Sequence, residues 1–104
     1  MTGRIDALSA LRDGPRDGAL LRLSLAQALL DASRTDEAIA ELRRAVAFDP
    51  EYSAAWKLLG RTLAASADAA AAIEAYRCGI AAAQKRGDKQ AEKEMTVFLR
   101  RLER

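Results

Sequence analysis

Two basic residues that could bind an anion, Lys57 and Arg61, lie four positions apart in this 104-residue sequence. Residues at that spacing share one face of a helix, where two like charges cost roughly 0.2 to 0.5 kcal/mol unless something offsets them. An acidic peptide segment or a C-terminal carboxylate would offset them. The plainer interpretation is a solvated face on which Asp31, from a neighbouring helix, acts as a counter-ion, because exposed ion pairs contribute little stability.

Other residue types that carry chemistry are scarce. The sequence has no histidine and one cysteine, Cys78, so it predicts neither an intramolecular disulfide nor a Cys/His zinc site. It also lacks a glycine-rich phosphate loop and a nucleophile elbow. Adjacent carboxylates such as Asp36 and Glu37 lie where a helix should start, and capping accounts for them. We expect a protein that is not an enzyme and that binds no cofactor and no metal.

The composition favours helix almost throughout. Half of the residues are hydrophobic, about a quarter are alanine, and the chain has only 2 prolines and 6 glycines. The formal net charge of +2 is too small to indicate nucleic acid as a partner. The sequence has no leader-like apolar run and no stretch that approaches the ~20 apolar residues of a membrane span. We therefore expect a cytoplasmic protein with no membrane contact.

Apolar spacing and helix-breaking residues predict six helices. The first, over residues 5–12, is short, and Asp13-Gly14-Pro15 ends it. The later helices are expected to end near residues 32, 48, 66, 86 and 103. The residues expected to cap or start them are Asp17 for the second helix, Thr35 or Asp36 for the third, Asp49 with Pro50 for the fourth, Asp68 for the fifth, and Gly87 with Asp88 for the last.

The sequence repeats at a spacing of 34 residues. Residues of the first unit and their counterparts in the second are Leu25 and Leu59, Leu29 and Leu63, Ala38 and Ala72, Ile39 and Ile73, and Arg43 and Arg77. A period of this length marks a solenoid, in which pairs of helices bury their apolar faces by stacking on their neighbours. The expected function is a surface for contacting other proteins.

The second unit carries a recognisable motif. Its residues are Trp56, Leu59, Gly60 and Leu63, followed by Ala72 and Tyr76. This spacing resembles the tetratricopeptide repeat (TPR), whose motif is W-x2-L-G-x2-Y followed by A-x3-F and P. The first unit matches more loosely, with Arg22 where the second unit has Trp56, an expected core residue. The resemblance implies an all-α solenoid of TPR-like helical hairpins, and we expect one domain over residues 1–104, with a short helix at 5–12, repeats at 19–52 and 53–86, and a capping helix at 88–103.

In the TPR family, the first helix of each unit lines a concave groove that receives a peptide or a partner helix. The groove candidates that the resemblance implies are Leu23, Gln27, Asp31, Lys57 and Arg61, and others expected on the same faces are Leu20, Ser24, Ala54, Leu58 and Ala65. The implied function is that of a non-catalytic adaptor or scaffold. Its expected partner is a protein or peptide, with an acidic segment among the candidates.

Two other classes of function stay open. The capping helix, with Met95 and Phe98, could pair two copies as a homodimer instead of contributing only to the core. The C-terminal residues Arg100, Arg101 and Arg104 could touch RNA or an acidic surface. However, arginines at a helix C-terminus also stabilise the helix dipole, and no aromatic platform accompanies these three.

Overall fold

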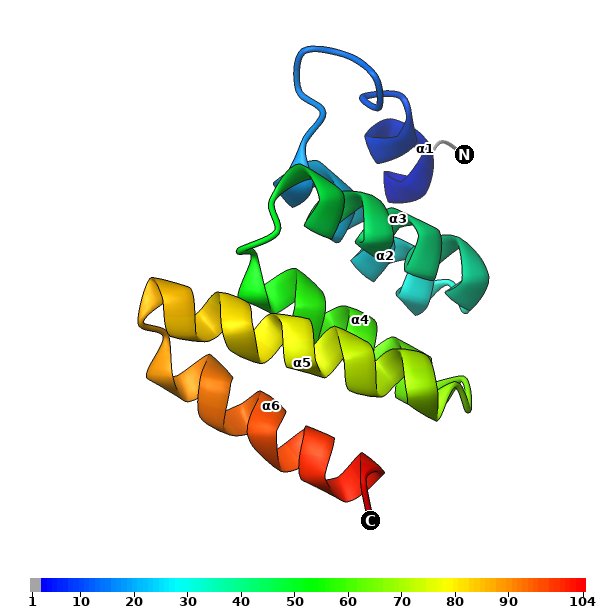
Figure 1. Ribbon diagram of the computed structural model, residues 1–104. Coiled ribbons are helices and arrows are strands. Elements are labelled where there is room, and N and C mark those ends of the chain that lie inside the picture. Colours follow the sequence, from blue (N-terminus) through cyan, green and yellow to red (C-terminus); the bar gives the residue numbers. More distant parts are fainter. Residues whose placement is uncertain (1–2) are drawn as a thin grey trace. The chain divides into compact units, whose positions relative to one another are not determined.

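The computed structural model describes residues 3–104, and these form six α-helices and no strand (Figure 1). The helices are α1 (Arg4–Ser9), α2 (Ala19–Asp31), α3 (Thr35–Phe48), α4 (Ser53–Ala65), α5 (Ala69–Arg86) and α6 (Lys89–Leu102). The predictions of an all-α chain and of six helices are confirmed for these residues. Met1 and Thr2, which the predicted domain includes, lie outside the described residues.

The chain divides into two compact units. The first ends at Asp49 and the second begins at Pro50. In the first unit, α2 and α3 form a helical hairpin whose core is almost completely buried. The core residues exposed by 3% or less are Leu25, Ala26, Leu29, Ala38, Leu42 and Ala45. The short α1 contributes no buried residue, so it covers the hairpin only loosely.

In the second unit, the helices approach closely where glycine replaces a larger residue. A Cβ added to Gly60 of α4 would lie 2.6 Å from Cε1 of Tyr76 on α5. A Cβ added to Gly79 of α5 would lie 2.5 Å from Sδ of Met95 on α6. Met95 is fully buried, and half-buried Phe98 packs its ring 5.7 Å, centroid to centroid, from that of Tyr76. The placement of Met95 in a core is therefore confirmed.

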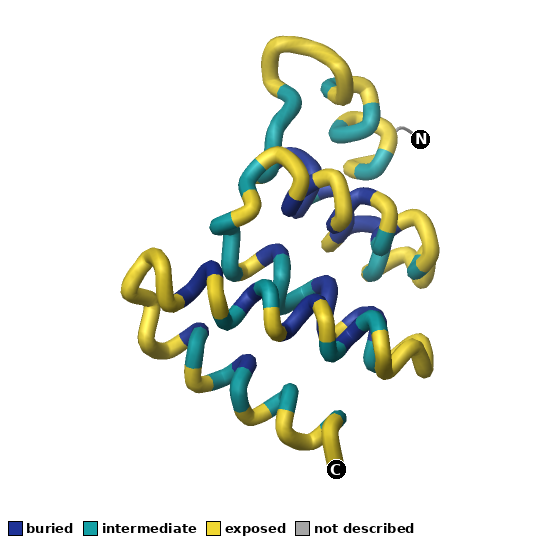
Figure 2. The backbone as a smooth tube through the Cα atoms, viewed as in Figure 1, coloured by how far each residue is buried: buried dark blue, intermediate teal, exposed yellow. Residues whose placement is uncertain are grey.

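The tight turns inside the two hairpins have the same geometry. Ser33 and Ala67 adopt left-handed φ angles of 61° and 62°. The next residue donates its N–H to a helix carbonyl in both turns, from Arg34 to Leu29 at 2.8 Å and from Asp68 to Leu63 at 3.0 Å. Corresponding atoms lie 34 residues apart, so the sequence period is also present in the backbone. Along each hairpin, buried and exposed segments alternate, as expected of helices that bury one face (Figure 2).

The predicted starts of α5 and α6 are confirmed. Asp68 Oδ1 accepts a hydrogen bond from the Ala71 N–H at 3.2 Å, and Asp88 Oδ1 accepts one from the Ala91 N–H at 3.1 Å. These bonds satisfy amides that have no partner within the helix. Gly87 ends α5 at φ 72°, the left-handed conformation that glycine adopts without steric cost.

The predicted caps of α2 and α3 are wrong. The residues that precede these helices are Gly18 and Arg34, and neither makes a side-chain capping bond. Asp17 lies one residue too early, and its carboxylate is engaged by Arg22. The left-handed turn leads directly into α3, so Thr35 is the first residue of the helix and Asp36 follows it inside the helix.

The predicted start of α4 at Asp49 and Pro50 is also wrong. Asp49 is the C-terminal cap of α3. Pro50 lies in the following loop, where its carbonyl accepts a hydrogen bond from the Trp56 indole N–H at 2.8 Å. The helix begins only at Ser53, after Tyr52. The Asp-Pro pair therefore marks a connection between helices rather than the first turn of one.

Candidate functional site

The candidate groove residues fall into two sets, one in each unit. On α2, Leu23 is buried with 7% of its surface exposed, whereas Gln27 and Asp31 are exposed one turn apart. On α4, Lys57 is half-buried and Arg61 is exposed. Each set lies on one face of its own helix. A groove that joins the two sets stays a prediction.

A hollow of about 250 Å³ lies beside Lys57, between α4 and α6. Its lining comes from the N-terminal halves of both helices and from the residue that caps α6: Ser53, Ala54, Lys57, Asp88, Gln90, Ala91 and Glu94. Lys57 Nζ donates a hydrogen bond to Glu94 Oε1 at 3.2 Å. The acid that contacts Lys57 is thus supplied by α6. Sequence reasoning did not single out Glu94 or Gln90, because the repeat motif assigns the capping helix no part in the groove.

Arg61 lies one turn beyond Lys57 on the exposed part of α4. Within residues 3–104 it makes no ion pair with an acidic side chain. Burial raises the pKa of the Tyr76 hydroxyl, and the charge of Arg61 opposes that rise. Arg61 is therefore a guanidinium that can accept an anionic ligand without first losing an intramolecular partner.

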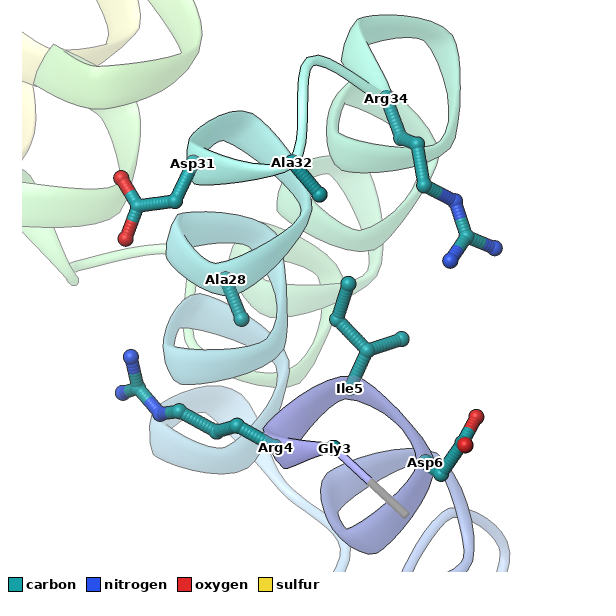
Figure 3. Close-up of a pocket in the computed structure, with 8 residues that line it drawn as sticks. All are labelled: Gly3, Arg4, Ile5, Asp6, Ala28, Asp31, Ala32 and Arg34. Carbon is teal, nitrogen blue, oxygen red and sulfur yellow. The ribbon is translucent and has the colours of Figure 1, made fainter. Parts of the chain in front are cut away.

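A larger and more open hollow, of about 470 Å³, lies between α1 and the C-terminal end of α2 (Figure 3). Its floor is apolar, with Ile5, Ala28 and Ala32 directed toward the middle. Charged side chains stand around it, with Asp31 and Arg4 on one side. Asp31, a candidate from the sequence, therefore borders a hollow that the sequence did not predict.

The most buried charge of the first unit is Arg22, which in the sequence is only a departure from the TPR motif. Its Nε and Nη2 donate to Oδ1 and Oδ2 of Asp17 at 2.8 and 2.7 Å, and its Nη1 donates to Glu41 Oε1 at 2.9 Å. The other Glu41 oxygen accepts from Arg12 Nη1 at 2.8 Å. These contacts link Arg12 and Asp17, in the loop between α1 and α2, to Glu41 and Arg22 of the helical hairpin.

The electrostatics of this cluster are strongly coupled. Hydrogen bonds from Arg22 lower the pKa of Asp17 far below its ordinary value of 3.8. The hydrogen bond to Asp17 in turn raises the pKa of Arg22. A signal was present in the sequence, because Glu41 stands 34 residues before Ala75, a core position of the second unit. Glu41 and Arg22 thus occupy positions at which the second unit has the apolar residues Ala75 and Trp56. An acid and a base at two such positions indicate a buried ion pair.

Neither of the two hollows is lined by Trp56 or Cys78. Trp56 is half-buried, and its indole N–H donates to the Pro50 carbonyl. The free Cys78 is half-buried as well. Among residues 3–104 no cluster of His, Cys, Asp and Glu side chains could hold a metal ion. None of the six helices combines the length and apolar character needed to cross a membrane.

The fold and these exposed helix faces define a helical-hairpin repeat protein. The sequence profile of the tetratricopeptide repeat matches residues 19–62. The TPR repeat-containing protein PA0015 of Pseudomonas aeruginosa is 53% identical over 88 residues, which are 85% of this chain and 84% of that protein. The chain therefore belongs to the tetratricopeptide repeat family.

Solved structures agree with this assignment. The solution structure of protein BPP2914 from Bordetella parapertussis is 45% identical with a TM-score of 0.79, and the match covers 98% of this chain and 89% of that chain. The solution structure of a tetratricopeptide repeat domain protein from Salinibacter ruber is 26% identical with a TM-score of 0.79, over 88% and 91% of the two chains. The predicted TPR-like fold is confirmed. Proteins of this family generally act as non-catalytic scaffolds that bind other proteins or peptides.

Proposed function

We propose that this protein is a non-catalytic adaptor that binds a peptide or protein segment, and that the exposed face of α2 and the exposed face of α4 are its candidate contact surfaces. The observation that carries the proposal is the pair Lys57 and Arg61 on α4, of which Arg61 has no acidic partner within residues 3–104. Gln27 and Asp31 offer exposed polar groups on α2, whereas Leu23 is buried.

The geometry around Lys57 favours a ligand with an acidic group. The Lys57 and Glu94 side chains are 31% and 42% exposed, so their ion pair contributes little stability and a ligand can replace it. A carboxylate placed between Lys57 and Arg61 would offset both charges, and Gln90 at the edge of the hollow could donate or accept a further hydrogen bond. We expect modest affinity that falls as salt is added, because the contacts are exposed.

The test is capture of partners from a cell lysate with the wild type and with the double variant Lys57→Gln/Arg61→Gln. Neutral glutamine avoids placing a second acid beside Glu94. The matched control is Arg16→Gln/Arg43→Gln, which removes the same charge from two exposed positions on the first unit. Circular dichroism would establish that all three proteins are folded.

We expect the Lys57→Gln/Arg61→Gln variant to lose a partner that the wild type and the control variant both retain. If the Lys57→Gln/Arg61→Gln variant keeps every partner, the assignment of the binding surface to α4 is wrong.

Fractionation of the same cells would test the predicted cytoplasmic location.

The alternative proposal is self-association as a homodimer. Val97 on α6 is 46% exposed and could form an apolar contact between two copies. However, a symmetric contact brings the same surface of both copies together, and the exposed residues around Val97 are basic. Sedimentation of the pure protein tests this alternative, since a monomer at tens of micromolar would exclude it.

A further inference from the structure

Within residues 3–104, the glutamates of α6 are paired with neighbouring helices, whereas its basic side chains are not. The three glutamates on or next to α6 each contact another helix: Glu94 accepts from Lys57 of α4, Glu92 accepts from Gln84 of α5 at 3.0 Å, and Glu103 accepts from Arg77 of α5 at 2.6 Å. Asp88, the residue before α6, instead caps the helix by accepting from the Ala91 N–H. These glutamates are therefore paired with side chains of the same unit, while the Glu94 and Glu103 side chains remain 42% and 39% exposed.

The basic residues of α6 are all exposed. They are Lys89, Lys93, Arg100 and Arg101, with Arg104 just beyond the helix, and none of them makes an ion pair within residues 3–104. At 100° per residue these positions and Val97 fall within about one third of the helix circumference. We call this set the basic face. It extends over about 22 Å, from the 1.5 Å rise per residue.

The stability of α6 explains its C-terminal arginines but does not explain the positive charges of Lys89 and Lys93. Arg100 and Arg101 in the last turn interact favourably with the helix dipole. Lys89 is the first residue of α6, where positive charge is unfavourable, and Lys93 follows it at the spacing at which like charges repel. Residues that cost stability and remain exposed are typical of binding surfaces.

We propose that the basic face of α6 is a second docking surface, separate from the face of α4, and that its partner is an acidic amphipathic helix of another protein. Acids repeated every three or four residues on such a helix would match the basic residues in spacing and sign. One apolar side chain of the partner would contact Val97 at the centre.

Nucleic acid and an anionic membrane fit this face less well. The face carries no aromatic side chain on which a base could stack, and phosphate groups gain nothing from an exposed valine. A membrane-surface helix needs a broad apolar face, and the apolar side of α6 is turned into the cluster around Tyr76 and Met95. A second copy of this chain would present the same positive charges.

The test measures binding of a synthetic acidic helical peptide by fluorescence anisotropy at physiological ionic strength. The peptide has about the length of α6, with glutamates on one face around a central leucine, and an oligothymidylate of similar charge serves as the competing class of ligand. The variants are Lys93→Glu/Arg100→Glu, Val97→Asp, and the control Arg16→Glu/Arg43→Glu, whose charge change equals that of the first variant.

We expect the wild type to bind the peptide, the α6 double variant to bind it at least about tenfold more weakly, and the control variant to bind it within about twofold of the wild type. Val97→Asp should weaken peptide binding but leave oligothymidylate binding unchanged. The proposal is wrong if both double variants lose the same peptide affinity. It is also wrong if the wild type binds oligothymidylate more tightly than the peptide, or does not bind the peptide. The variant Lys57→Gln/Arg61→Gln should still bind the peptide, so this proposal and the proposed adaptor function can fail separately.

Discussion

Arg22 shows most clearly how one residue can replace an apolar core contact. Its guanidinium satisfies Asp17 and Glu41 at distances of 2.7 to 2.9 Å, and the three side chains are only 7% to 9% exposed. Removing one member of such a cluster leaves the others desolvated and unpaired. The cluster therefore depends on all of its members.

The first prediction concerns this residue. The substitution Arg22→Met should lower the free energy of unfolding by about 2 kcal/mol, between the values for exposed and fully buried ion pairs. Urea denaturation measures the change. Arg44→Met is a suitable control, because Arg44 is exposed and, like Arg22, lies over the Phe48 ring. A loss in the Arg22 variant no greater than in the control would show that the cluster adds nothing to stability.

The second prediction is a pH dependence from Asp17. Its pKa in the folded protein lies below the ordinary value of 3.8, so the unfolded chain binds a proton first as the pH falls. The stabilisation is complete above about pH 5 and is lost progressively below it. The variant Asp17→Asn should be less stable than the wild type at neutral pH, and the difference should narrow at pH 3. A constant difference from neutral pH to pH 3 would contradict the assignment of this shift to Asp17.

At the scale of the helices, the approach of α4 to α5 depends on Gly60. The third prediction is that Gly60→Ala destabilises the protein by about 1 to 3 kcal/mol, because the new Cβ would overlap the rigid Tyr76 ring. Thermal unfolding would measure it. Gly3→Ala is the control, since no atom lies within 4 Å of a Cβ built there. Equal effects of the two substitutions would mean that this close contact is not what sets the helix spacing.

The fourth prediction distinguishes the two ends of α6. Lys89→Glu should stabilise the helix by about 0.5 kcal/mol, because it places a negative charge in the first turn and an opposite charge four residues before Lys93. Arg100→Glu should destabilise it by a similar amount, because it reverses a charge in the last turn. Hydrogen exchange of the α6 amides measures both changes. If Lys89→Glu does not stabilise α6, the argument that Lys89 lowers the stability of this helix is wrong.

The helices themselves could largely be predicted from the sequence. The 34-residue period and the apolar spacing identified the six helices, and the ends of α2 to α6 lie within one residue of their expected positions. The starts of α2, α3 and α4 could not be predicted. Short polar residues such as Asp17 and Asp49 have more than one possible partner, and only the folded chain brings Arg22 close enough to decide among them.

For the whole molecule, the sequence predicted the family and the kind of function, because the repeat motif specifies which small and large residues pack together. The candidate site was predicted only in part. Lys57 and Arg61 lie on one face of α4 as expected, but Glu94 reaches Lys57 from a helix outside the motif. Of the basic face, the sequence indicated only the C-terminal arginines, because a count of net charge does not show that the glutamates of α6 are paired with α4 and α5.

The measurement that tests the adaptor proposal most directly is photo-crosslinking in living cells from a photoreactive residue in place of Arg61. The matched site is Arg43, an exposed arginine on α3. The proposal predicts that a defined protein is captured from the Arg61 site, is absent from the Arg43 site, and disappears when Lys57→Gln is added. Identical products from both sites, or none from Arg61, would contradict the claim that α4 presents a protein-binding surface.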